Sequence, residues 1–141
     1  MDNNDLHKEI DLIQNCISRM ARNSFMLKGW AISLLAVVLA ITTDRLNPLF
    51  LFFSVFVPLV CFWYLDAFFL RTEKMYRKMY EWVLKERKEG RLDFQYDLEP
   101  SRFKNQVKSH CRVMLSTTLR VFYGIPSLVV LIIILYQFIV K

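Results

Sequence analysis

The sequence predicts an all-α membrane protein with three transmembrane helices. Residues 48–65 and residues 121–140 contain no charged side chain. As helices rising about 1.5 Å per residue they would be about 27 and 30 Å long, close to the thickness of a bilayer's hydrocarbon core. A third apolar stretch, residues 29–43, spans only if its helix begins near residue 24 and Lys28 extends its ammonium to the headgroups. A soluble domain with three buried core helices is the alternative.

Lysine and arginine predict how the spans are oriented. The connection between the first two spans carries Arg45 alone, whereas residues 66–120 carry thirteen basic residues and the first 28 residues carry four. The positive-inside rule therefore predicts an N-in, C-out topology. The first apolar stretch starts too far into the chain for a cleavable signal. The expected order is a cytoplasmic amphipathic helix (1–28), two spans (24–43 and 47–66), a cytoplasmic basic helical region (67–120) and a third span (121–140).

Asp66 interrupts the apolar stretch FWYLDAFFL, residues 62–70, and needs a partner or water. Folding the first two spans back on the turn DRLN (44–47) brings Lys28 to within about one helical turn of Asp66. We therefore expect a Lys28–Asp66 ion pair at the cytoplasmic membrane boundary. It would act as a latch, or as part of a charged ring at a pore entrance. The alternative is a simple anchor at the headgroups, with Asp66 hydrated.

The N-terminal residues show a heptad pattern that predicts a packing seam. Its apolar positions are spaced alternately by four and three residues. No proline or glycine occurs before Gly29, so the helix is expected to continue into the first span. The seam could pack on the extension of the second span or mediate self-association, and the two can coexist. As an oligomer seam it comprises Leu6, Ile10, Ile13, Ile17 and Met20.

The second span is also expected to continue past the boundary, as an amphipathic helix that stops at Gly90. Residues 91–100 resemble a connection. A further cytoplasmic helix is expected to start at Ser101 and lead into the third span.

Basic side chains dominate residues 66–120, with thirteen Lys or Arg against eight Asp or Glu. The positive-inside rule and contact with anionic headgroups explain such an excess in many membrane proteins. In an oligomer the same charges would line a positive vestibule able to bind a nucleotide or a single-stranded oligonucleotide, with Tyr76, Tyr80, Phe94 or Tyr96 stacking on bases. The candidate ligand-binding residues are Arg71, Lys74, Arg77, Lys78, Arg102, Lys104, Lys108 and Arg112.

Enzyme chemistry finds little support in this sequence. His7 and His110 are far apart, and three glycines cannot form a phosphate-binding loop. The seven residues between Arg102 and His110 exceed the spacing of HEPN ribonucleases. The three cysteines, Cys16, Cys61 and Cys111, form no CxxC pair and are expected to be free thiols. We therefore expect no enzyme, no cofactor and no metal.

Two stretches, RMARNSFMLKGW (19–30) and FWYLDAFFLRTEKMYRKMY (62–80), resemble small bacterial inner-membrane effectors of antiphage defence loci. The resemblance covers about residues 6–88. It implies a homo-oligomeric, channel-like assembly, with a tetramer as one candidate, that disrupts the membrane potential. One model is the Hailong-type effector, in which a partner nucleotidyltransferase makes an oligodeoxyadenylate signal that holds the channel closed. Effectors gated by cyclic nucleotides and the membrane accessory proteins of RNA-guided defence are other models, and the sequence does not choose among them. The matching positions are Arg19, Asn23, Lys28, Trp30, Trp63, Asp66, Glu73 and Arg77.

The expected function is therefore a membrane effector gated by a nucleotide or oligonucleotide signal. The alternative is a non-conducting membrane anchor or scaffold that recruits a cytosolic partner. The spans offer few polar side chains to line a wet pore, so a pore would be narrow or closed by a dewetting apolar constriction. These polar residues are Ser33, Thr42, Thr43, Ser54, Ser127 and Gln137.

Overall fold

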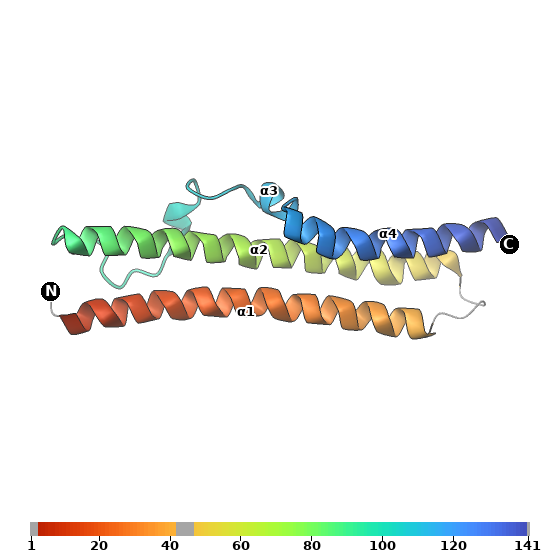
Figure 1. Cartoon of the computed structure of the whole chain (residues 1–141), viewed down its shortest axis with the longest axis horizontal. Coiled ribbons are helices and arrows are strands. Elements are labelled where there is room, and N and C mark those ends of the chain that lie inside the picture. The colour runs from red at the N-terminus through yellow and green to blue at the C-terminus, as the bar shows by residue number, and fades with distance from the viewer. Residues whose placement is uncertain (1–2, 42–46, 141) are drawn as a thin grey trace.

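The computed structural model describes residues 3–41 and 47–140, and this part of the chain is helical without strands (Figure 1). Three long helices are apolar and long enough to cross a membrane, as the sequence predicts. Thr42, Thr43 and most of the DRLN turn lie outside the described residues, as does the side chain of Gln137. The elements in order are α1 (Asn3–Ile41), α2 (Pro48–Lys88), the 3-10 turn η1 (Pro100–Phe103), α3 (His110–Met114) and α4 (Thr117–Val140).

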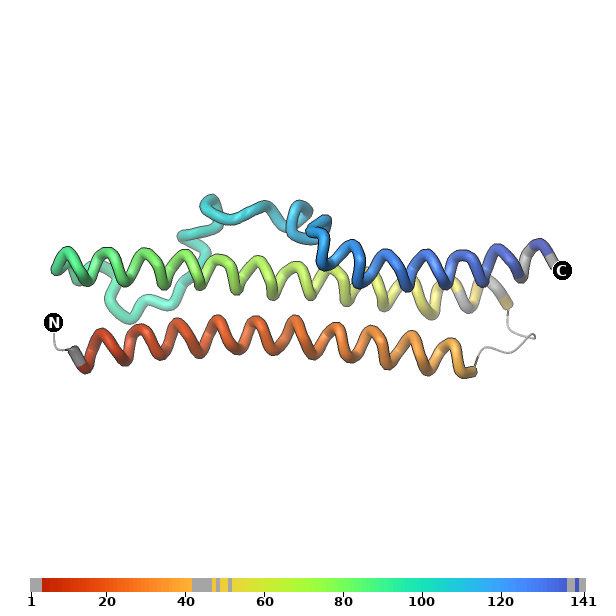
Figure 2. The backbone as a smooth tube through the Cα atoms, viewed as in Figure 1, coloured from red at the N-terminus to blue at the C-terminus, as the bar shows by residue number. Residues whose placement is uncertain are grey.

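α1 and α2 lie antiparallel along their whole length, and α4 packs beside the first half of α2 (Figures 1 and 2). Asn47 caps α2, because its side chain accepts a hydrogen bond from the Leu49 amide at 3.0 Å, and Pro48 suits the first helical turn. The helix ends at Lys88. Gly90 follows with φ at 76°, a conformation that favours glycine. α1 and α2 are thus each one continuous helix, and they extend over most of the length of the molecule (Figure 1).

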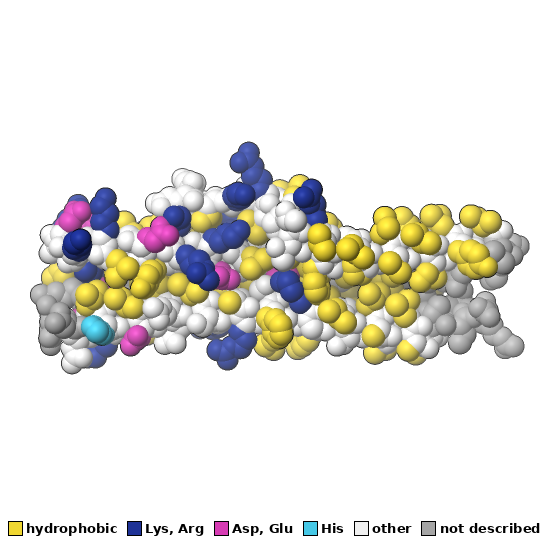
Figure 3. Space-filling model, viewed as in Figure 1, with side chains coloured by type: hydrophobic (Ala, Val, Ile, Leu, Met, Phe, Trp, Pro, Cys, Tyr) yellow, Lys and Arg dark blue, Asp and Glu magenta, His cyan; other side chains and the backbone are white. Residues whose placement is uncertain are grey.

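Along its long axis the molecule has one half rich in charged side chains and one half in which the surface side chains are apolar (Figure 3). We call residues 4–23, 67–88 and 89–116 the polar half, and residues 24–41, 47–66 and 117–140 the apolar half. Large apolar side chains on the surface of the apolar half are widely exposed, including Phe25 at 76% and Trp30 at 61%. A soluble monomer rarely exposes so much apolar surface, so lipid or other protein surfaces must cover it.

The heptad seam packs within the chain. Ile13 is buried against Met75, Met79 and Val83 of α2, and Ile17 and Met20 pack at the edge of the same cluster. Leu6 and Ile10 are half-buried farther along α1. The structure thus places the seam between α1 and α2, which is the intramolecular alternative. Its self-association stays a prediction.

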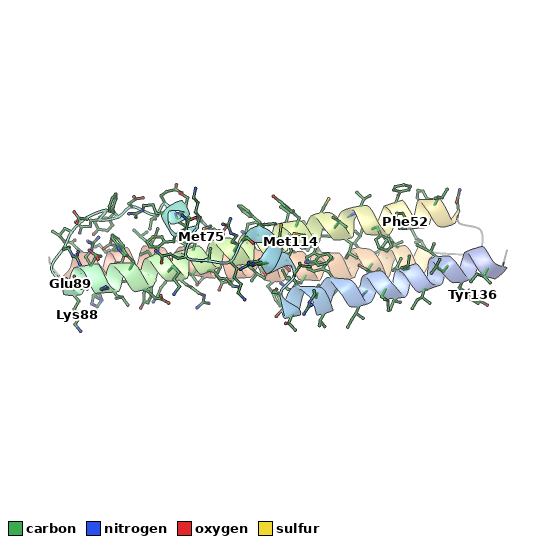
Figure 4. The ribbon with its side chains drawn as sticks, turned by 90° about the horizontal axis from the view of Figure 1, so that it is seen from above. Phe52, Met75, Lys88, Glu89, Met114 and Tyr136 are labelled. Atoms are coloured by element: carbon green, nitrogen blue, oxygen red, sulfur yellow. The ribbon has the colours of Figure 1, made fainter. Side chains whose placement is uncertain are left out.

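A second apolar cluster holds the three spans together. Val38 of α1 and Val55 of α2 are buried with Val130 and Ile134 of α4. Phe52 stacks on Phe56 at the edge of this cluster, with ring centroids 4.6 Å apart (Figure 4). All three helices contribute to one core at the far end of the apolar half.

The prediction of one helix from Ser101 to the third span is wrong. Only residues 100–103 form a 3-10 turn, residues 104–109 are not helical, and α3 has five residues. The physical reason is the side chain of Arg71, which donates to the carbonyls of Lys104 and Lys108 at 3.4 and 3.2 Å. Those carbonyls are thereby drawn to α2 instead of accepting helical hydrogen bonds. We call residues 104–109 the strap.

Candidate functional site

The centre of the candidate site is Asp66, which α2 places against both other long helices. Its side chain is 0% exposed. Ser24 of α1 donates to Oδ1 at 2.5 Å, and Lys28 Nζ lies 2.6 Å from Oδ2. The hydroxyl of Tyr123, in α4, donates to Oδ2 at 3.0 Å. One carboxylate therefore joins all three helices, and we call these four residues the Asp66 cluster.

A hydrogen bond within α1 connects two members of the Asp66 cluster, Lys28 and Ser24. Ser24 and Lys28 are one helical turn apart and lie on the same face. The Lys28 ammonium donates to Ser24 Oγ at 2.8 Å, so Ser24 both accepts from Lys28 and donates to Asp66. A buried carboxylate is tolerated only when it is paired and hydrogen-bonded, and these donors meet that requirement.

Aromatic and apolar side chains shield the cluster. Ala67 and Leu119 are fully buried beside it. Trp63 lies nearly parallel to the Tyr123 ring at 6.0 Å between centroids, and its Nε1 donates to the carbonyl of Met114 at 2.9 Å. Met114 belongs to α3, so the same shell connects the cluster to the segment that leads into α4.

The structure thus brings together Lys28 and Asp66, the pair proposed from the sequence, and adds two residues that sequence reasoning missed. In the heptad pattern Ser24 is only an interruption of the seam, and its position one turn before Lys28 is the available signal. Tyr123 is the first hydroxyl inside the third apolar stretch, but no sequence pattern places it opposite Asp66.

A second buried ion pair connects α1 and α2 near the end of the polar half that is farthest from the spans. Arg87 of α2 and Glu9 of α1 form two hydrogen bonds of 2.9 Å each, with both side chains almost fully buried. Arg87 also donates to the carbonyls of Arg91 and Asp93, and Glu9 accepts from the Tyr96 amide at 3.1 Å. The hydrogen bonds from Arg87 to Glu9 raise the pKa of Arg87. This pair fastens α1, α2 and the loop after α2 together.

The loop after α2 contains two residues in the left-handed region, Phe94 at φ 55° and Tyr96 at φ 59°. Such angles are uncommon for residues other than glycine and persist where the surroundings hold them. Here Glu9 holds Tyr96 through its amide. No sequence pattern indicates the Glu9–Arg87 pair, because Glu9 adjoins the seam and Arg87 lies in a run of alternating charges.

Four of the eight candidate ligand-binding residues are engaged within the chain. Arg71 holds the strap, Arg77 pairs with Glu73 at 2.7 Å, and Lys78 pairs with Glu81 at 2.6 Å. Arg102 lies over the ring of Phe94 at 4.2 Å and near those of Trp82 and Phe103, with Asp97 at 3.4 Å. These contacts engage the four side chains within the chain, which leaves them less free to bind an external anion.

The other four candidates, Lys74, Lys104, Lys108 and Arg112, are exposed. No acidic side chain among the described residues forms an ion pair with them. Three of the four are on the strap or in α3. Of the aromatic residues expected to stack on bases, Tyr76 is buried and Tyr80 is half-buried in the core, whereas Phe94 and Tyr96 are exposed.

His110 begins α3, with its ring 4.4 Å from that of Tyr64. Burial, followed by the nearby Arg71 guanidinium, lowers its pKa below the usual 6.5. In the described part of the chain its Nε2 has no hydrogen-bond partner. The folded protein therefore prefers the neutral imidazole.

We expect acidification to destabilise the fold through His110. The unfolded chain takes up this proton near pH 6.5, above the folded pKa, so the stabilisation is present above pH 6.5 and is lost as the pH falls below it. The unfolding temperature in detergent should drop more between about pH 7.5 and 5.5 in the wild type than in a His110→Asn variant. Equal drops would show that His110 does not carry the effect.

No group of three or more metal-ligating side chains comes together in residues 3–41 and 47–140. Cys16, Cys61 and Cys111 are free thiols. Comparison of the chain with family models, curated proteins and solved structures found no match. The arrangement of the site itself therefore carries the functional argument.

Proposed function

We propose that the protein is a gated membrane effector in which the Asp66 cluster holds the three spans in a closed arrangement. The observation that carries this proposal is the joining of all three helices by one buried carboxylate. The latch has a paired state and a broken state, and the broken state requires water or another donor to reach Asp66, because a buried carboxylate left without its partner is strongly unfavourable. That property suits a switch.

The proposed signal is an anion bound by the exposed basic residues of the strap and α3. The strap is attached to α2 through Arg71, five residues beyond Asp66, and leads through α3 to α4. A ligand that binds Lys104, Lys108 and Arg112 would pull on this connection. Displacement of α3 would strain the Trp63–Met114 hydrogen bond and shift Tyr123 relative to Asp66.

The conducting form we propose is a homo-oligomer assembled through exposed apolar surfaces of the spans. Ser33 is exposed and Ser54 is half-buried, whereas Ser127 is bonded to its own helix through the Tyr123 carbonyl at 2.6 Å. So few polar groups favour a narrow path closed by an apolar constriction. The polar half would face the cytoplasm of a bacterium, with the spans in the inner membrane.

The biological setting we propose is antiphage defence, from the resemblance described above. The ligand would be a nucleotide or a single-stranded oligodeoxyadenylate made by a partner nucleotidyltransferase. The effector would then collapse the membrane potential when infection changes the level of that signal. The basic strap and its uncompensated charge support an anionic ligand of this class.

Ion flux from liposomes containing the pure protein tests this proposal. We expect short oligodeoxyadenylates or cyclic nucleotides to change the flux, and Lys104→Gln/Lys108→Gln to abolish the response. Lys85→Gln/Lys88→Gln removes the same charge at the far end of α2 and should leave the response unchanged. An intact oligomer that stays ion-tight with every ligand would overturn the proposal and favour the membrane anchor.

A further inference from the structure

One surface of α1 has a basic part toward the polar half, which we call upper, and an apolar part toward the apolar half, which we call lower. It consists of two adjoining hollows, of about 570 and 270 Å³, that share Asn23 and Met26. The upper hollow is lined by Asn15, Arg19 and Arg22 among others. The lower hollow is completed by Leu27, Trp30 and Phe69. We call the two together the α1 groove.

The α1 groove crosses the boundary between the polar and apolar halves. If the first span begins at residue 24, the edge of the bilayer's hydrocarbon core lies at that residue. A rise of about 1.5 Å per residue then puts the Cα atom of Arg22 about 3 Å above this edge and that of Arg19 about 7.5 Å above it. The headgroup layer on each side of a bilayer is roughly 5–8 Å thick. Both guanidinium groups thus originate at headgroup depth, while Met26 and Trp30 lie at acyl-chain depth.

Both arginines are available for an external anion. In the described residues neither forms an ion pair, and Arg19, which lies near Tyr76, donates a long hydrogen bond to Cys16 Sγ at 3.8 Å. The hollow on the other side of α1 differs, because it contains Glu81 and the paired Arg77. Uncompensated positive charge therefore distinguishes the α1 groove from the hollow on the other side of α1.

We propose that the α1 groove is a binding site for one anionic phospholipid of the leaflet on the side of the polar half. Arg19 and Arg22 would bind its phosphate in the bidentate manner that guanidinium groups favour. Asn23 would hydrogen-bond to the glycerol region, and an acyl chain would lie along Met26, Leu27 and Trp30. A free nucleotide or phosphate would leave this lower hollow uncovered, which is why a lipid is the occupant that fits.

The site adjoins the Asp66 cluster. Asn23 immediately precedes Ser24, and Leu27 precedes Lys28, so the same turn of α1 faces the groove on one side and Asp66 on the other. A bound lipid would therefore hold this turn in place. The inference is independent of conduction, because it requires only that the chain spans a membrane.

The test counts phosphatidylglycerol and phosphatidylcholine molecules retained by the purified full-length protein, using native mass spectrometry and titration in nanodiscs. Arg19→Gln/Arg22→Gln should weaken phosphatidylglycerol binding by about 30-fold, since each basic residue near a membrane surface contributes a factor of about five. Lys85→Gln/Lys88→Gln, which removes the same charge farther from the boundary, should weaken it less than about threefold. An equal loss in both variants would overturn the proposal in favour of general surface charge.

Two further measurements distinguish a lipid seated in the groove from a phosphate bound at the arginines alone. Asn23→Trp keeps every charge but fills the point where the two hollows meet, and it should displace the retained lipid. Glycerol phosphate at millimolar concentration should not displace the lipid, because it lacks the acyl chain. Retention by Asn23→Trp, or displacement by glycerol phosphate, would show that no lipid is seated in the groove.

Discussion

Replacing Lys28 by methionine should lower the free energy of unfolding by about 3–5 kcal/mol, the cost of removing one partner from a buried ion pair. Methionine keeps most of the side-chain volume, so the loss reports the missing charge. Asp66 would remain fully buried with only the hydroxyl groups of Ser24 and Tyr123 as donors. Unfolding by a denaturing detergent in mixed micelles measures the change.

Two companion variants identify the cause of that loss. Lys28→Arg keeps the charge and should retain most of the stability. Lys28→Met/Asp66→Leu removes both charges, and it should be more stable than Lys28→Met alone because no unpaired charge remains. A loss below about 1 kcal/mol in Lys28→Met would mean that Asp66 is hydrated, as in the headgroup-anchor alternative.

Glu9→Gln should also cost about 3–5 kcal/mol, since it leaves the buried Arg87 guanidinium without the carboxylate to which it is hydrogen-bonded. The amide nitrogen of glutamine would face one of the guanidinium donors that now bind a carboxylate oxygen. The loop after α2 should then open, because Tyr96 is held in its left-handed conformation by the same carboxylate. Faster amide exchange at residues 91–97, together with the unfolding measurement, would show both effects.

Glu81→Gln is the matched control for this prediction. It makes the same chemical change in the pair with Lys78, in which both side chains are exposed by more than a third. Exposed pairs of this kind contribute less than about 1 kcal/mol. If Glu81→Gln and Glu9→Gln destabilise the protein equally, burial is not what makes the Glu9–Arg87 pair important.

The sequence predicts the long helices well because their signals are strong and local. Uncharged stretches of about twenty residues indicate spans. The absence of proline and glycine before Gly29 indicates a continuous α1, and Gly90 marks the end of α2. Lys28 and Asp66 could be paired because a tight connection between antiparallel helices fixes their depth.

Contacts between distant segments could not be predicted in the same way. Tyr123 reaches Asp66 only because α4 packs on α2, and no spacing rule relates residues 57 positions apart. The helix expected from Ser101 fails because Arg71 binds the strap carbonyls, a tertiary interaction that overrides local helix propensity. Arg102 looks like a free basic residue in the sequence, and its aromatic neighbours are brought to it only in the folded chain.

Ligand-free ion flux through Asp66→Asn in liposomes tests the central claim most directly. Asparagine keeps the shape of the side chain but cannot pair with Lys28, and Lys28 can turn toward the headgroups because it is partly exposed. The proposal predicts that Asp66→Asn conducts without any ligand, under conditions in which the wild type stays closed. An Asp66→Asn protein that folds, assembles as the wild type does and remains ion-tight would contradict the claim that this cluster is the latch.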